Sequence, residues 1–326
     1  MPQPYTSRVF KQNGGTRGAP YVISNDNAGY ASTYNMTSGL IASANTYFVG
    51  LEDALGSVRG PVETAVAMGM HFDNPITQHT PDWYIDNEIG SFTLGPDATS
   101  PLDLASAYAT VAASGTHCDP IPVVGVLDQN GQPMTDADGQ PLETADRCTP
   151  DALKPGVADT LANMMVGVVT SGTGRRAAIP GHTIGGKTGT TQDNKTAAFG
   201  GIMPKYAVSV MYFDPLGKVL VGGEGGGVPA TIFHDAMAPI LAGQPDTPFP
   251  PADPAVEAGT KGSGYVAPPP APTPSPTPSE QPPTDTPTDP GTGDGDGDGG
   301  GDPGNGGGDP GNGGDPGNGG GPPAEN

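Results

Sequence analysis

The chain has 326 residues, 53 of them glycine and 40 proline, and a formal net charge of -22. Lysine and arginine are few, form no basic stripe and do not alternate with aromatic residues, which argues against nucleic acid as a partner. The apolar runs that could build a core stop near residue 243. We therefore expect one folded domain over residues 1–243 and a disordered tail, rich in Pro, Gly and Asp, over residues 244–326.

Targeting signals and metal motifs are both missing from the sequence. No segment has the pattern of a signal peptide, a twin-arginine signal or a membrane span. The five histidines are scattered and form no H-E-x-x-H pattern. We expect no metal site, no cofactor and no membrane span in this chain.

The first half of the domain begins with loops and continues with helices. Residues 1–35 are rich in turn formers and lack a clear period, so we expect loops there. The stretch "NMTSGLIASANTYFVGLEDALG" that follows holds two apolar runs, which predict two helices joined at Ser43–Asn45. A further helix is expected with Ser100 as its N-cap and Gly115 at its end.

Two cysteines, Cys118 and Cys148, bracket a segment with the pattern of an exposed hairpin, in which Asn130–Gly131 is typical of a primed turn. Their even number and loop-closing placement favour a disulfide, and hence an oxidising compartment. Two free thiols are the alternative.

The second half of the domain predicts a helix, a group of strands and a closing helix. The first helix begins near Pro155. The runs "TAAFGGIMP" and "YAVSVMYFDP" predict two strands joined by a tight turn at Pro204–Lys205, and "ATIFHDAMAPILAG" predicts the last helix. This order indicates an α+β fold with an antiparallel sheet flanked by helices.

The stretch "GHTIGGKTGTT", residues 181–191, fits two different motifs. Read from Gly181 it is a phosphate-binding loop, and read from Lys187 it is Lys-Thr-Gly. A phosphate loop needs a buried parallel strand before it and a long helix after it. The charged "GRRAAIP" precedes the stretch and "GTTQDNKTAAFGG", without a helical face, follows it. These flanks disfavour a nucleotide site and favour a Lys-Thr-Gly triplet on the edge of an antiparallel sheet.

The Lys-Thr-Gly triplet gains weight from a second element, Ser43-Ala44-Asn45, which precedes it in the order found in penicillin-recognising serine enzymes. Residues from roughly 20 to 243 resemble the transpeptidase domain of class A penicillin-binding proteins, and the actinobacterial members most of all. The stretches that carry the resemblance are "LIASANTYFVGLEDALG", "FTLGPDATSPLDLASAYATVAASG", "GGKTGTTQDNKTAAFGGIMP" and "ATIFHDAMAPILAGQP". The resemblance implies the serine β-lactamase/transpeptidase fold.

The resemblance also implies an activity and roles for three residues. The complete domain would form an acyl-enzyme on peptidoglycan stem peptides that end in D-alanyl-D-alanine, and it would bind β-lactams. Ser43 would pass a proton between a catalytic lysine and the leaving amine, and Asn45 would bind the substrate amide. Lys187 would place positive charge in the site and so help to keep the catalytic lysine neutral.

The remaining residues of the triplet strand are expected to bind substrate. By the resemblance, the hydroxyls of Thr188 and Thr190 suit the terminal carboxylate of the peptide, and the backbone N–H of Thr190 is one oxyanion-hole donor. Gly189 must be small so that the substrate can lie against the strand.

The nucleophile of these enzymes belongs to an S-x-x-K motif, and no serine in this chain has a lysine three residues later. Ser7 comes closest, but Lys11 is four residues on. In the family the motif lies farther upstream of S-x-N than this chain reaches. We therefore expect a domain that is incomplete at its N-terminus and inactive alone, from a parent protein of the cell envelope.

Two other functions remain open. A serine β-lactamase shares both motifs, but we find no E-x-x-L-N loop to activate a hydrolytic water. A non-catalytic wall-binding or scaffold module would keep the binding residues without the nucleophile.

Overall fold

The computed structural model describes residues 3–27, 29–72, 78–95, 98–142, 147–216 and 219–259, all of which lie in one unit of the chain. The expected disordered tail from residue 260 onward therefore lies outside the described residues.

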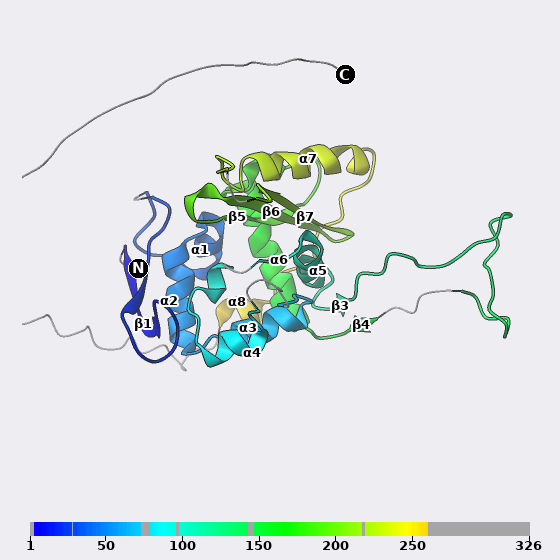
Figure 1. Ribbon diagram of the computed structural model, residues 1–326. Helices are drawn as coiled ribbons and strands as arrows, with labels where there is room; N and C mark the ends of the chain where they lie inside the picture. Colours follow the sequence, from blue (N-terminus) through cyan, green and yellow to red (C-terminus); the bar gives the residue numbers. More distant parts are fainter. Residues whose placement is uncertain are drawn as a thin grey trace, which may run out of the picture. The chain divides into compact units, whose positions relative to one another are not determined.

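A three-stranded antiparallel sheet lies in the upper part of this unit as drawn in Figure 1. Its strands are β5 (Gly185–Thr190), β6 (Thr196–Met203) and β7 (Tyr206–Phe213), in the order β5-β6-β7. The expected turn at Pro204–Lys205 is confirmed, since Met203 pairs with Tyr206 across it. β5 is an edge strand among the described residues, so within this part of the chain one of its edges has no strand partner.

Helices cover both faces of the sheet (Figure 1). α7 (Val228–Leu241) packs on one face, and α5 (Pro101–Ala112) and α6 (Pro155–Thr170) pack on the other. The structure thus confirms the α+β class, the antiparallel sheet and these three expected helices. The expected cap is also present, because the Ser100 hydroxyl accepts a hydrogen bond from the backbone N–H of Asp103.

Successive side chains of a strand point to opposite faces of the sheet, so β6 packs against different helices on its two faces. Phe199 is fully buried and packs edge-on against Phe233 of α7, with ring centroids 5.1 Å apart. Ile202, on the opposite face, packs in the cluster that contains Met165 of α6. Gly201 makes the α7 contact possible, because a Cβ there would lie 2.2 Å from the Phe233 ring.

The prediction of loops over residues 1–35 is wrong. β1 (Tyr5–Lys11) and β2 (Pro20–Ile23) form an antiparallel pair. Phe10 is fully buried in a core cluster that also contains Val49 of α2 (Asn45–Leu55). The turn formers that suggested loops gather between the two strands, and an irregularity in the register between Thr6 and Lys11 interrupts the alternation of buried and exposed residues in β1.

Several short elements were not anticipated from the sequence. They are α3 (Arg59–Ala67), α4 (Pro81–Asp86), α8 (Pro254–Ala258), η1 (Phe92–Leu94), η2 (Arg175–Ala177) and η3 (Gln192–Asn194). Within the described part of the chain, no helix has the length and apolar character needed to cross a bilayer.

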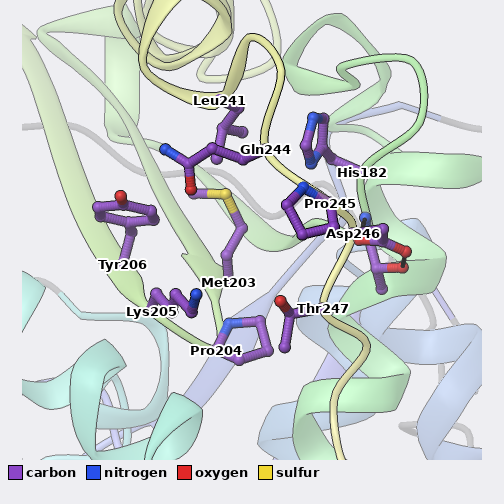
Figure 2. Close-up of a pocket in the computed structure, with 11 residues that line it drawn as sticks. His182, Met203, Pro204, Lys205, Tyr206, Leu241, Gln244, Pro245, Asp246 and Thr247 are labelled. Atoms are coloured by element: carbon purple, nitrogen blue, oxygen red, sulfur yellow. Dashed lines mark hydrogen bonds between the residues drawn. The ribbon is translucent and has the colours of Figure 1, made fainter.

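Residues 244–259, which composition places in the tail, pack along the domain as a strap. Phe249 is buried beside α6, and the backbone N–H of Asp253 donates to the hydroxyl of Thr160 at 3.0 Å. Asp246 accepts hydrogen bonds from the N–H and hydroxyl of Thr183, at 2.7 and 2.8 Å. Figure 2 shows the strap beside a pocket of about 20 Å³, room for a single water molecule.

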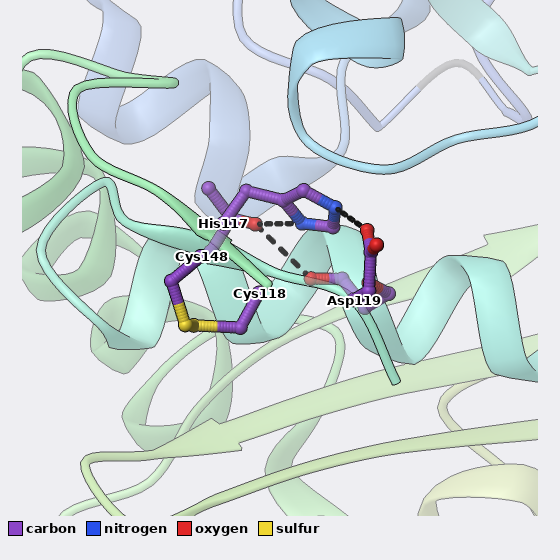
Figure 3. The surroundings of a disulfide bond; sticks show 6 residues. His117, Cys118, Asp119 and Cys148 are labelled. Atoms are coloured by element: carbon purple, nitrogen blue, oxygen red, sulfur yellow. Dashed lines mark hydrogen bonds and ion pairs between the residues drawn. A yellow bond between two sulfur atoms is a disulfide. The ribbon is translucent and has the colours of Figure 1, made fainter. Parts of the chain in front are cut away.

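A disulfide bond between Cys118 and Cys148 closes the segment between these two cysteines at its base (Figure 3). The two cysteines pair across the short strands β3 (His117–Cys118) and β4 (Cys148–Thr149). The prediction of a primed turn at Asn130–Gly131 is wrong. A type I′ turn requires positive φ at both central residues, and Gly131 has positive φ but Asn130 does not. Instead, the backbone carbonyl oxygen of Asp128 accepts a hydrogen bond from the N–H of Gly131, which fixes a turn with one left-handed residue.

Candidate active site

The two motifs that define the candidate site lie on different elements. Ser43 is the C-cap of α1 (Met36–Ala42), and Asn45 begins α2 (Asn45–Leu55), as the sequence predicts. Ser43 has left-handed backbone angles, φ 55° and ψ 47°, which turn the chain sharply between the helices. Such angles are uncommon in residues other than glycine and concentrate at functional sites.

Helix packing carries this junction to the sheet. α1 packs against α6, and α6 packs against β5. The first contact is close at Gly167, where a Cβ would lie 2.6 Å from the side chain of Ile41. The junction of α1 and α2 is thereby held beside β5.

Lys187 and Ser43 are in direct contact although 144 positions separate them. The Lys187 ammonium donates to the Ser43 hydroxyl at 2.6 Å and to the carbonyl oxygen of Thr188 at 2.7 Å. Burial lowers the pKa of Lys187 from 10.5 to about 8. The ammonium is therefore still charged at pH 7 and can release its proton within about one pH unit of neutrality.

Asn45 lies at the same junction, and its amide nitrogen donates to the carbonyl oxygen of Ser24 at 3.2 Å. This bond ties the start of α2 to the segment that follows β2. The side chain has two donor hydrogens and an acceptor oxygen, so the bond does not use all of its capacity.

Two loops contact the hydroxyls of Thr188 and Thr190 on β5. The hydroxyl oxygens of Thr188 and Thr173 lie 2.7 Å apart. The hydroxyl oxygen of Thr190 accepts a hydrogen bond from the backbone N–H of Gly225 at 3.2 Å. Sequence reasoning missed Thr173 and Gly225, because each lies in a glycine-rich turn that carries no motif of its own.

A cavity of about 750 Å³ brings all the predicted site residues together. The polar part of its lining contains the six residues expected to act on or bind substrate: Ser43, Asn45, Lys187, Thr188, Gly189 and Thr190. The apolar part includes Phe48, Met70, Phe72, Phe92, Leu104, Tyr108, Met211 and Phe213. Lys187 is the one charged side chain among the described lining residues, so the cavity suits an anionic ligand with apolar groups.

Ser7, the serine nearest to an S-x-x-K pattern, does not line this cavity. It is buried on β1, where its hydroxyl donates to the carboxylate of Asp53 at 2.6 Å and accepts from the N–H of Phe10. These contacts give Ser7 a structural role.

The family model for the penicillin-binding protein transpeptidase domain matches residues 4–238. The chain therefore belongs to the family of penicillin-binding protein transpeptidase domains. This family comprises serine-type D,D-transpeptidases, and the relatives below place the chain with class A penicillin-binding proteins.

Two curated relatives and one solved structure show how far the likeness extends. Penicillin-binding protein 1A of Neisseria gonorrhoeae is 36% identical over 156 residues, which cover 47% of this chain and 19% of the relative. The protein of the same name from Clostridium botulinum is 31% identical over 196 residues, covering 59% and 21%. The chain thus spans about a fifth of the length of these relatives.

The solved structure is PonA1 of Mycobacterium tuberculosis in complex with penicillin V. It matches with a TM-score of 0.60 and 27% identity, covering 71% of this chain and 63% of PonA1.

Proposed function

We propose that this chain is the part of a peptidoglycan D,D-transpeptidase that binds the D-alanyl-D-alanine end of the stem peptide and transfers protons there. The contact between Lys187 and Ser43 carries this proposal, because it unites the two motifs at 2.6 Å inside a cavity large enough for a peptide end. The parent protein then works in the cell envelope, where peptidoglycan is built.

The reaction has two halves. In the first, a serine oxygen attacks the carbonyl carbon of the penultimate D-alanine, the C–N bond breaks, and D-alanine leaves with a proton on its amine. In the second, an amine of a neighbouring stem peptide attacks the ester, the cross-link forms, and the serine regains its proton. Ser43 relays the proton to the leaving amine, and the charge of Lys187 lowers the energy of the anionic intermediate.

The open edge of β5 is the docking surface for the peptide backbone. An edge strand offers unpaired N–H and C=O groups to which an extended peptide can add. Gly189 is exposed on this strand, and a Cβ there would meet only Ala198, at 3.7 Å. The peptide carboxylate then lies at the hydroxyls of Thr188 and Thr190, close to the Lys187 charge.

β-Lactams are expected to occupy the same place. They carry a carboxylate beside a strained amide, so they present the same two groups as the D-alanyl-D-alanine end. PonA1, the structural relative, was solved with penicillin V.

The missing S-x-x-K motif favours a second candidate, a binding module that does not acylate. We propose that this chain alone is catalytically inactive, because none of its serines is followed by the required lysine. Its binding residues are nevertheless assembled around one cavity.

Two measurements on the purified chain test these proposals. We expect saturable binding of N-acyl-D-alanyl-D-alanine, weakened at least tenfold in Lys187→Met and unchanged in Lys205→Met, which alters an exposed turn lysine. Equal binding by wild type and Lys187→Met would overturn the substrate assignment. A fluorescent penicillin should leave no covalent label on the denatured chain. A stable label would refute its inactivity, and rapid hydrolysis would indicate a β-lactamase.

A further inference from the structure

We propose that Thr173 and the backbone N–H of Gly225 are positioning groups for the substrate carboxylate. They occupy acceptor sites on the hydroxyls of Thr188 and Thr190, so that both hydroxyl protons point to the ligand. This inference rests on the proposed function and adds to it two groups outside both motifs.

Thr173 is held in place by the turn that ends α6. The backbone N–H groups of Gly172 and Gly174 both donate to the carbonyl oxygen of Val168, at 3.1 and 3.0 Å. A Cβ at Gly172 would lie 2.6 Å from the carbonyl oxygen of Ile41, so the turn sits tightly against α1. The turn thereby fixes the Thr173 hydroxyl 2.7 Å from that of Thr188.

The loop that carries Gly225 is held equally close to β5. A Cβ at Gly225 would lie 2.2 Å from the carbonyl oxygen of Ala198 and 2.5 Å from that of Gly189. Only glycine permits this approach, which brings the Gly225 N–H within 3.2 Å of the Thr190 hydroxyl. The N–H can only donate, so the Thr190 oxygen must accept.

The direction of the bond between Thr173 and Thr188 follows from the ligand. A hydroxyl has one donor hydrogen and two acceptor sites. A carboxylate only accepts, so a bound carboxylate takes the Thr188 proton, and the short contact then requires Thr173 to donate. Each strand hydroxyl thus accepts from a neighbouring loop and donates to the carboxylate, and hydrogen bonds in such a chain polarise and strengthen one another.

The test compares two ligands and three variants in equilibrium binding. The ligands are N-acyl-D-alanyl-D-alanine with a free carboxylate and the same peptide as its C-terminal amide. We expect Thr173→Val to lower affinity for the free acid about tenfold. Affinity for the amide should change less than twofold, and Thr173→Ser should restore binding of the acid. Thr170→Val is the matched control, because that exposed hydroxyl donates to Val166 within α6.

The outcomes separate this inference from the function on which it rests. If wild type binds acid and amide equally, the carboxylate site itself is wrong and both proposals fail. If wild type prefers the acid and Thr173→Val keeps that preference, only the role of Thr173 is wrong. Thermal unfolding confirms that each variant is folded. If Thr173→Val does not fold, Thr173→Ala replaces it and must show the same selective loss.

Discussion

Lys187 combines burial with direct contact to the Ser43 hydroxyl, so its protonation controls the charge of the cavity. Its pKa of about 8 means that the ammonium is present at pH 7 and is lost as the pH rises through 8. We predict that affinity for a peptide with a free carboxylate falls about tenfold between pH 7 and pH 9. Affinity for the C-terminal amide should stay nearly constant. Calorimetric titrations across this range check the prediction, and parallel curves for the two ligands would contradict it.

Glu52 is a buried carboxyl that the proposed chemistry does not use. Burial, reinforced by the charges of Asp53 and Glu88, raises its pKa from 4.5 to about 8, while the nearby backbone of Thr93 partly opposes the shift. The folded state therefore keeps a proton that the unfolded chain releases above pH 4.5. The contribution of Glu52 to the free energy of unfolding should therefore fall as the pH rises from about 4.5 and level off above about 8.

Glu52→Gln keeps the shape of the protonated acid and cannot ionise. We predict that it stabilises the domain at pH 8 by an amount on the order of 3 kcal/mol, and little at pH 4. Urea unfolding at the two pH values measures the difference. Glu63→Gln, at an exposed surface ion pair with Arg59, serves as control and should change stability by less than about 0.5 kcal/mol at both. An equal effect of Glu52→Gln at both pH values would argue against a buried neutral acid.

At the scale of the elements, the sheet contains one glycine that packing requires, Gly201, and one that the proposed function assigns to substrate docking, Gly189. A Cβ at Gly201 would clash with Phe233, whereas a Cβ at Gly189 would meet open space apart from Ala198. We predict that Gly201→Ala destabilises the domain by about 1–3 kcal/mol. Gly189→Ala should leave stability unchanged and weaken peptide binding. Thermal unfolding together with peptide binding distinguishes the two effects, and the reverse pattern would contradict the docking of substrate on β5.

The elements that the sequence predicted are those with a local signal. Ser100 and Pro101 mark the start of α5, and the turn at Pro204–Lys205 separates two runs with strand character. β1 and β2 were not predicted because their stability comes from contact with α2, which no local sequence pattern shows. The roles of Thr173 and Gly225 were not predicted for the same reason, since each depends on a contact with a strand residue distant in the sequence.

At the scale of the whole molecule, the strap of residues 244–259 stabilises the folded domain. Phe249 is buried with Met165 and Ile202, so removing its ring opens a cavity in the core. We predict that Phe249→Ala costs about 3–5 kcal/mol, and that ending the chain after Gly243 costs at least as much. Ending it after Gly259 should leave the unfolding midpoint unchanged. If both truncations unfold at the same temperature, the strap does not stabilise the domain.

The central claim is that Ser43, Asn45 and Lys187 form one binding site with the open edge of β5. A crystal structure of the chain with N-acyl-D-alanyl-D-alanine tests it most directly. The account predicts the peptide along β5, with its carboxylate at the hydroxyls of Thr188 and Thr190 and Lys187 still bonded to Ser43. A peptide bound elsewhere, or a lysine turned away from Ser43 into solvent, would contradict it.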